Sequence, residues 1–140
     1  MKFAIIQALF NKEITDGLLK GAARAFKENK VPQKNLKIVQ VPGAWEIPVM
    51  AENLARTKKY QAIICLGAVI KGQTTHDYWI CQAVFPALQE LTIKYNLPIT
   101  LGIITCQNWK QAQARSKNNK ENRGYVAAKA AMEMMKLLRN

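Results

Sequence analysis

The sequence predicts an α/β fold, a three-layer αβα sandwich in which a four-stranded parallel sheet lies between two layers of helices. Short apolar runs of strand length alternate along the whole chain with amphipathic stretches of helical spacing. The chain has 140 residues, of which 49% are hydrophobic, enough to bury a core. No repeat, low-complexity stretch or linker divides it, so we expect one domain over residues 1–140.

Four apolar runs are expected to form the strands. They span residues 2–9, 36–41, 61–66 and 97–105. Pro42 and Gly43 end the second run, and Pro98 lies at the start of the fourth. Because crossovers between parallel strands are right-handed, the expected strand order is 2-1-3-4, a flavodoxin-like arrangement.

Five amphipathic stretches are expected to form the helices. Asn11 can cap the first, whose apolar positions run at helical spacing from Ile14 to Phe26. Pro86 lies inside the third and should kink it. The last is apolar nearly all round, so we expect it to be buried on two sides, partly against further copies of the chain. The remaining helices are expected at residues 47–57, 76–95, 109–114 and 124–138.

Charge and composition exclude several functional classes. The formal net charge is +12, but the basic residues are spread along the chain outside residues 110–123, and no nucleic-acid-binding motif occurs. We therefore expect no nucleic acid as the main ligand and a charge that attracts anionic substrates. Three scattered cysteines and one histidine predict neither a disulfide framework nor a metal site.

The apolar runs are also too short for a membrane protein. None approaches the roughly 20 residues that a membrane span needs, and the first apolar run is too short for a secretion signal. We therefore expect no membrane partner and a cytoplasmic location.

The stretch from Gly67 to Asp77 is the most informative part of the sequence. It contains two glycines, a lysine, two threonines and the only histidine, His76, at an expected strand-to-helix turn. Exposed N–H groups at such a turn favour an anion, and an imidazole exchanges protons near neutral pH. The glycine spacing matches neither the dinucleotide-binding motif nor the P-loop, so those ligands are not indicated.

Unusual residues also follow the first two expected strands. Phe10 follows the first, and Trp45 and Glu46 follow the second. Because parallel strands end at one edge of a sheet, we expect these side chains to meet the glycine-to-histidine turn there. A flat ring that forms hydrogen bonds, together with a phosphate, would fill such a site. Taken singly, plainer explanations by core packing, helix capping or solvation stay open for Phe10, Trp45, Glu46, Thr74, Thr75, His76 and Arg115.

Several of these pieces together carry a family resemblance. The most specific are the proline-glycine-aromatic-glutamate motif of residues 42–46 and the turn of residues 67–76. Matching pieces also occur at Phe10-Asn11, residues 101–105, Arg115 and residues 122–124. Over nearly its whole length the chain resembles the lumazine synthase family.

The resemblance implies an enzyme, a transferase of riboflavin biosynthesis. The family joins 5-amino-6-(D-ribitylamino)uracil to 3,4-dihydroxy-2-butanone 4-phosphate, without a cofactor, and releases phosphate and water. The product, 6,7-dimethyl-8-ribityllumazine, is formed in the penultimate step of that pathway.

The resemblance also implies roles for individual residues. His76 would carry protons, while Gln73 and Thr74 would bind phosphate through N–H groups and Arg115 through its guanidinium. In the family the pocket lies between subunits, so Leu101 and Arg115 would serve the neighbour's pocket. The residues implied to bind the ribitylaminouracil are Phe10, Ala44, Trp45, Glu46, Ala68, Val69, Ile70 and Leu101.

The chain departs from the family pattern at a few positions. Asp77 and Leu101 stand where phenylalanine is common, Trp45 also replaces a phenylalanine, and Arg123 replaces a lysine. The family forms pentamers, decamers or sixty-subunit shells; we expect a homopentamer as the smallest unit and leave the larger assembly open.

Two other functions remain as alternatives. One is a non-catalytic flavin- or lumazine-binding protein, and the other is a shell-forming scaffold whose basic interior binds nucleic acid. The presence of both His76 and Arg115 favours the enzyme over a protein that only binds.

Overall fold

A four-stranded parallel sheet with the order β2-β1-β3-β4 forms the middle layer of the molecule. The computed structural model describes residues 1–139. The expected fold class and strand order are confirmed. The strands are β1 (Phe3–Ala8), β2 (Leu36–Val41), β3 (Ala62–Ile70) and β4 (Ile99–Cys106).

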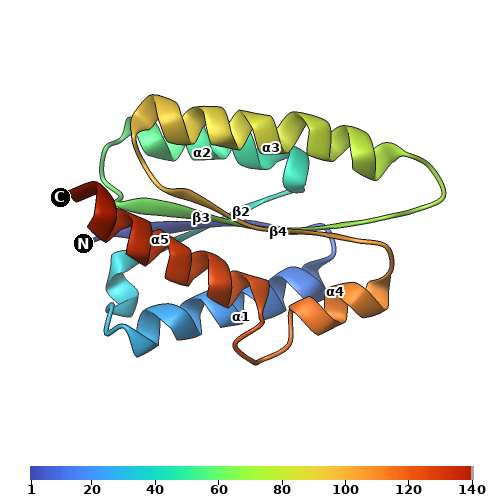
Figure 1. Cartoon of the computed structure of the whole chain (residues 1–140), viewed down its shortest axis with the longest axis horizontal. Helices are drawn as coiled ribbons and strands as arrows, with labels where there is room; N and C mark the ends of the chain where they lie inside the picture. Colours follow the sequence, from blue (N-terminus) through green and yellow to red (C-terminus); the bar gives the residue numbers. More distant parts are fainter. Residues whose placement is uncertain (140) are drawn as a thin grey trace.

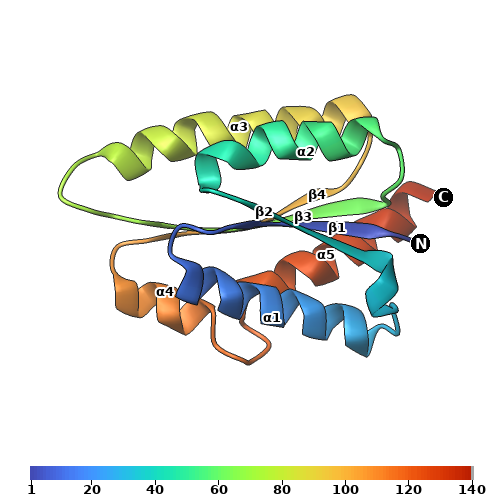
Figure 2. The same ribbon diagram turned by 180° about the vertical axis from the view of Figure 1, so that it is seen from behind.

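Helices cover both faces of this sheet (Figure 1, Figure 2). The helices α2 (Ile47–Arg56) and α3 (His76–Tyr95) lie on one face; α1 (Lys12–Glu28), α4 (Trp109–Arg115) and α5 (Arg123–Arg139) lie on the other. Each face has its own apolar core, because alternate residues of every buried strand point to opposite faces. Two short 3₁₀ helices, η1 (Gln33–Asn35) and η2 (Ala44–Glu46), flank β2.

The third strand is longer than the sequence predicts. It continues past Gly67 to Ile70, whereas the expected strand ended at residue 66. The glycine suggested a turn, but residues 67–70 pair with residues 103–106 of β4, and no glycine among the described residues has a positive φ. The last pair between β1 and β3 joins Gln7 and Leu66. The end of β3 therefore extends beyond β1 and pairs with β4 alone.

Asn11 connects the end of β1 to this extension of β3. It is the N-cap residue of α1, as expected, but it has a left-handed backbone (φ 61°) and its side chain makes no capping hydrogen bond. Its Nδ2 instead donates to the carbonyl oxygen of Ala68 at 2.9 Å. The backbone N–H of Phe10 donates to the carbonyl of Pro42 at 3.0 Å. These bonds fix Phe10 between the ends of three strands.

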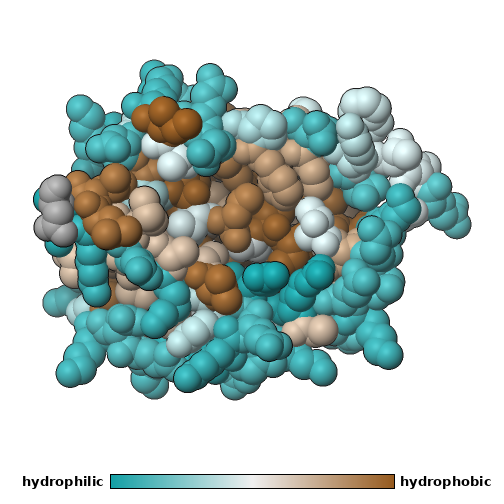
Figure 3. Space-filling view, viewed as in Figure 1, coloured by the Kyte–Doolittle hydropathy of each residue, from teal (hydrophilic) through white to brown (hydrophobic). Residues whose placement is uncertain are grey.

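The helix α5 is buried on one side within the chain. Tyr125, Ala128 and Met132 are among its buried residues, whereas Met134 and Leu137 are 40% and 59% exposed. The expectation of burial on two sides is therefore not met inside a single chain. Figure 3 shows apolar side chains gathered across the middle of this face of the molecule, with hydrophilic side chains above and below. An apolar face of this kind is typical of a surface that contacts another protein.

Asn122 links α5 to α1 and to the loop after α4. Its side chain is fully buried. Oδ1 accepts hydrogen bonds from the backbone N–H groups of Gly124 (2.9 Å) and Tyr125 (3.0 Å), and Nδ2 donates to the carbonyls of Gly17 (3.0 Å) and Lys117 (2.9 Å). This amide satisfies N–H groups that the first turn of a helix leaves unpaired.

Gly21 makes the buried position of Asn122 possible. A Cβ atom at Gly21 would overlap Asn122 Oδ1. The absence of a side chain at Gly21 therefore allows α1 to pack directly against the Asn122 amide.

We predict that Asn122→Ala lowers the free energy of unfolding by about 3 kcal/mol, because the buried groups that it pairs lose their partners. Urea denaturation measures this change. The matched control is Asn53→Ala, at an exposed position of α2 without a side-chain hydrogen bond to the described residues, which should change stability by less than about 0.5 kcal/mol. Equal effects of the two variants would contradict the role assigned to Asn122.

Candidate active site

A cavity of about 270 Å³ lies at the carboxyl ends of β1 and β3, beside the start of α3. This is the edge at which open parallel sheets bind ligands. It is lined by Ala8, Phe10, Ala44, Ala68, Val69, Ile70, Gly72, Thr74, His76, Asp77 and Ile80. The structure thus brings together Phe10, Ala44, the three residues at the end of β3, Thr74 and His76, as the sequence predicts.

The extension of β3 forms one wall of this cavity. Ala68 and Val69 are nearly buried and Ile70 is half-buried. Beyond the last pair with β1, the backbone of β3 has no second strand to bond, and the carbonyl of Ala68 bonds to Asn11 instead. Backbone N–H and C=O groups left without a strand partner are strong hydrogen-bonding groups for a ligand.

The loop of residues 71–75 and the first turn of α3 form the opposite wall. All five loop residues are exposed. The N-cap residue Thr75 makes no capping hydrogen bond through its side chain, and the backbone N–H of His76 contacts Thr74 Oγ1 at a long 3.3 Å. The N–H groups of Tyr78 and Trp79 bond to the carbonyl of Thr75 at 3.1 and 3.3 Å, whereas that of Asp77 has no acceptor within residues 1–139. The start of this 20-residue helix therefore offers an N–H group, together with the positive end of the helix, to an anion. Gln73 is exposed and does not line the cavity.

His76 lies on the first turn of α3 and lines the cavity. Within residues 1–139 its ring makes no hydrogen bond, and the residue is exposed. An imidazole placed in this way can reach a ligand in the cavity and exchange protons with it.

Trp45 and Glu46 lie at the rim rather than in the lining. Trp45 is 61% exposed, and Glu46 is half-buried. A Cβ atom at Gly43 would lie 3.4 Å from Glu46 Oε1 and 3.9 Å from Phe10 Cβ. The carboxylate therefore stands near the base of Phe10, whose ring is 71% exposed at the mouth of the cavity.

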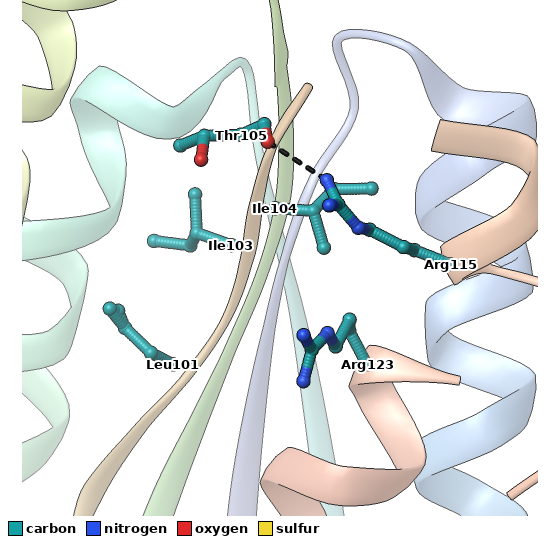
Figure 4. A pocket seen from close by; sticks show the side chains of 6 residues that line it. All are labelled: Leu101, Ile103, Ile104, Thr105, Arg115 and Arg123. Carbon is teal, nitrogen blue, oxygen red and sulfur yellow. Dashed lines mark hydrogen bonds between the residues drawn. The ribbon is translucent and has the colours of Figure 1, made fainter. Parts of the chain in front are cut away.

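A second hollow, of about 260 Å³, lies along the exposed edge of β4. Figure 4 shows the guanidinium groups of Arg115 and Arg123 on one side of the strand and Leu101 and Ile103 on the other. Arg115 Nη1 donates to the carbonyl of Thr105 at 3.0 Å and contacts Cys106 Sγ at 3.2 Å. Two cationic groups beside a sheet edge make this hollow suited to an anion.

The two hollows share no residue. Leu101 and Arg115 belong to the hollow at β4, whereas His76 and Phe10 belong to the cavity between β1, β3 and α3. One chain therefore does not bring all of the expected site residues together. The sequence identified Asp77 and Arg123 only as departures from the family pattern and assigned neither a role, although both line these hollows. The one sequence signal for Asp77 is its position three residues before Ile80, a spacing that places both residues on the same side of α3.

Two of the three cysteines, Cys65 and Cys81, do not supply a reactive thiolate. Burial raises the pKa of Cys65 to about 12. Burial also raises the pKa of Cys81 above its ordinary value, and the nearby Asp77 carboxylate adds to this shift. Thiolates are the nucleophilic form of cysteine, so these two side chains are poor nucleophiles at neutral pH.

Two further features of residues 1–139 bear on the kind of site. No three histidine, cysteine or acidic side chains in this part of the chain gather where they could hold a metal ion. None of its helices combines the length and apolar character required to cross a membrane.

Comparison with known proteins decides the family. The sequence model of the 6,7-dimethyl-8-ribityllumazine synthase family matches residues 1–139. The chain belongs to this family. A 6,7-dimethyl-8-ribityllumazine synthase of Coxiella burnetii (strain Dugway 5J108-111) is 42% identical over 138 residues, which cover 99% of this chain and 91% of the relative. Those of strains CbuG_Q212 and RSA 493 / Nine Mile phase I are each 41% identical over the same shares.

We predict that Cys65 in the native protein resists alkylation by iodoacetamide from pH 7 to pH 9. Its raised pKa, about 12, keeps the thiol protonated across this range, and its burial excludes the reagent. Mass spectrometry of the digested protein measures the labelling. The same treatment in denaturant should label all three cysteines, and rapid labelling of native Cys65 would show that the strand opens readily.

Proposed function

We propose that this chain condenses 5-amino-6-(D-ribitylamino)uracil with 3,4-dihydroxy-2-butanone 4-phosphate to give 6,7-dimethyl-8-ribityllumazine, phosphate and water. The observation that carries the proposal is the family match over residues 1–139, together with a cavity lined by the residues that such a reaction needs. Incubation of the purified protein with both substrates, followed by lumazine fluorescence, tests it directly.

The pyrimidine binds against Phe10 in this proposal. The ring of Phe10 is exposed at the mouth of the cavity and held by the bonds of residues 10 and 11, so it offers a ready face for stacking. Backbone groups of Ala68, Val69 and Ile70 bond to the edge of the ring. Ala44, Trp45 and the Glu46 carboxylate at the rim hold the ribityl chain and accept its hydroxyl hydrogen bonds.

The phosphate binds at the start of α3. Gln73 and Thr74 are exposed just before this helix, and Thr74 lines the cavity; their N–H groups bind the anion in this proposal, and the positive end of a long helix favours it. This arrangement places the carbon chain of the ketone between the phosphate and the stacked pyrimidine, next to His76.

His76 moves protons during the reaction. The amine attacks the ketone, the resulting carbinolamine loses water, phosphate is eliminated, and closure of the second ring releases water again. Several of these steps transfer a proton near neutral pH, for which a positioned imidazole typically contributes about 10²–10⁴-fold. Holding two substrates together supplies much of the remaining acceleration.

A neighbouring subunit completes the site. The proposal assigns the hollow at β4, with Leu101 and Arg115, to the cavity of an adjacent copy in a homopentamer or a multiple of pentamers. The separation of the two hollows within one chain and the exposed apolar side chains of α5 and β4 support this arrangement. Arg115 then binds the phosphate of the neighbour's ketone.

We predict that Arg115→Ala raises KM for the butanone phosphate at least about tenfold, because a charge-assisted bond to the phosphate is lost. Steady-state kinetics with the pyrimidine saturating measure this. Arg56→Ala, at an exposed position of α2, is the matched control and should leave KM unchanged. An unchanged KM in Arg115→Ala would remove the role proposed for this residue.

A second prediction concerns the shared site. His76→Ala should slow turnover at least about tenfold, and Arg115→Ala alone should be weakly active at butanone phosphate concentrations well below its raised KM. When the two variants are unfolded together and reassembled, about a quarter of the shared sites regain both residues in a random mixture of subunits. The activity should then exceed that of either variant alone. A mixture no more active than the mean of its parts would place each site within a single chain.

A further inference from the structure

The cavity contains one carboxylate, that of Asp77. Its Oδ1 atom is shielded from solvent and has no hydrogen-bond partner within residues 1–139. Apart from Thr74 and His76, the other side chains that line the cavity are apolar or absent. Leaving a carboxylate oxygen without a partner in such surroundings costs free energy, which a donor bound in the cavity would recover.

The position of Asp77 on α3 explains why it lies in the cavity. Asp77, Ile80 and Val84 follow one another at helical spacing on the side of α3 that faces the sheet. Ile80 also lines the cavity, and Val84 is buried in the core below it. At the first of these inward positions the chain has an acid in place of an apolar residue.

The other groups around Asp77 do not supply the missing donor. His76 is adjacent in sequence, but within residues 1–139 its ring makes no hydrogen bond to the carboxylate. Cys81 is close enough for the charge of Asp77 to raise the pKa of its thiol, yet no hydrogen bond joins the two side chains. The unpaired oxygen therefore points to a ligand with an O–H or N–H group.

The charge of Asp77 selects which part of a ligand lies beside it. A carboxylate repels a phosphate, so the phosphate lies toward the loop of residues 71–75 and away from Asp77. In the proposed arrangement the pyrimidine lies against Phe10, which is exposed at the mouth. Between them, on the same wall as His76, lies the carbon chain of the ketone, which has one hydroxyl group next to its carbonyl.

We infer that Asp77 accepts a hydrogen bond from this hydroxyl group and thereby selects a hydroxylated ketone phosphate. The inference rests on the proposed function and adds a specificity-determining residue to it. A site built to bond a hydroxyl rejects an analogue that lacks it, because the buried acceptor is then left unpaired.

The test compares two ligands on four proteins by isothermal titration. The ligands are the butanone phosphate and the analogue in which hydrogen replaces its free hydroxyl. The proteins are the wild type, Asp77→Leu, Asp77→Asn and the control Glu90→Gln, which removes a charge from an exposed position of the same helix. Inorganic phosphate serves as a probe of the anion site in each protein.

The wild type and Glu90→Gln should bind the hydroxylated ligand at least about tenfold more tightly than the analogue, as expected for a hydrogen bond to a charged group. In Asp77→Leu this preference should fall to nearly one, while phosphate still binds. In Asp77→Asn, which keeps a neutral acceptor, the preference should be at least about threefold smaller than in the wild type.

A wild-type preference in Asp77→Leu, with the assembly mass unchanged by light scattering, would overturn the inference. If Asp77→Leu fails to assemble, the test rests on Asp77→Asn. A wild-type preference in Asp77→Asn would also overturn the inference, because the charge of Asp77 would then contribute nothing to the choice of ligand. Failure of the proposed function is a separate result: the wild type would form no fluorescent lumazine from the two substrates, whatever the titrations give.

Discussion

The unequal reach of neighbouring strands determines where this molecule can bind a ligand. β3 pairs with β1 only as far as Leu66, but it pairs with β4 as far as Ile70. The sheet therefore has a step at its carboxyl edge, and the cavity lies over that step. The Asn11 amide closes part of the step by bonding to Ala68, and the cavity occupies the remaining space.

A second constraint supports the cationic hollow at the exposed edge of β4. The buried Asn122 amide joins α1, the loop after α4 and the start of α5. Arg115 ends α4 and Arg123 begins α5, so the amide fixes the backbone close to both arginines. The cavity and the hollow at β4 are thus built by different parts of the chain. Asn11 bonds to a backbone carbonyl beside the cavity, and Asn122 bonds to backbone carbonyls near the hollow.

Much of this architecture could be predicted from the sequence, because alternating periodicities and right-handed crossovers leave few arrangements for so short a chain. Most of the residues expected around the cavity also lie together there, because parallel strands end at one edge of the sheet. The predicted end of β3 was wrong. Glycine is common in turns, so the sequence suggested a turn at Gly67, but pairing with β4 keeps the backbone extended there. Asp77 was noted as a departure but given no role, because its contact with the cavity depends on the rotation of α3 about its axis, which residue types alone do not determine.

The contacts of Arg115 have a consequence for the entropy of binding. A long side chain free in solvent has many rotamers, and their loss opposes the capture of a ligand. Here the guanidinium is already held by the Thr105 carbonyl and the Cys106 sulfur. The side chain is therefore ordered when the chain folds, and in the proposed site the phosphate would bind a guanidinium that is already fixed.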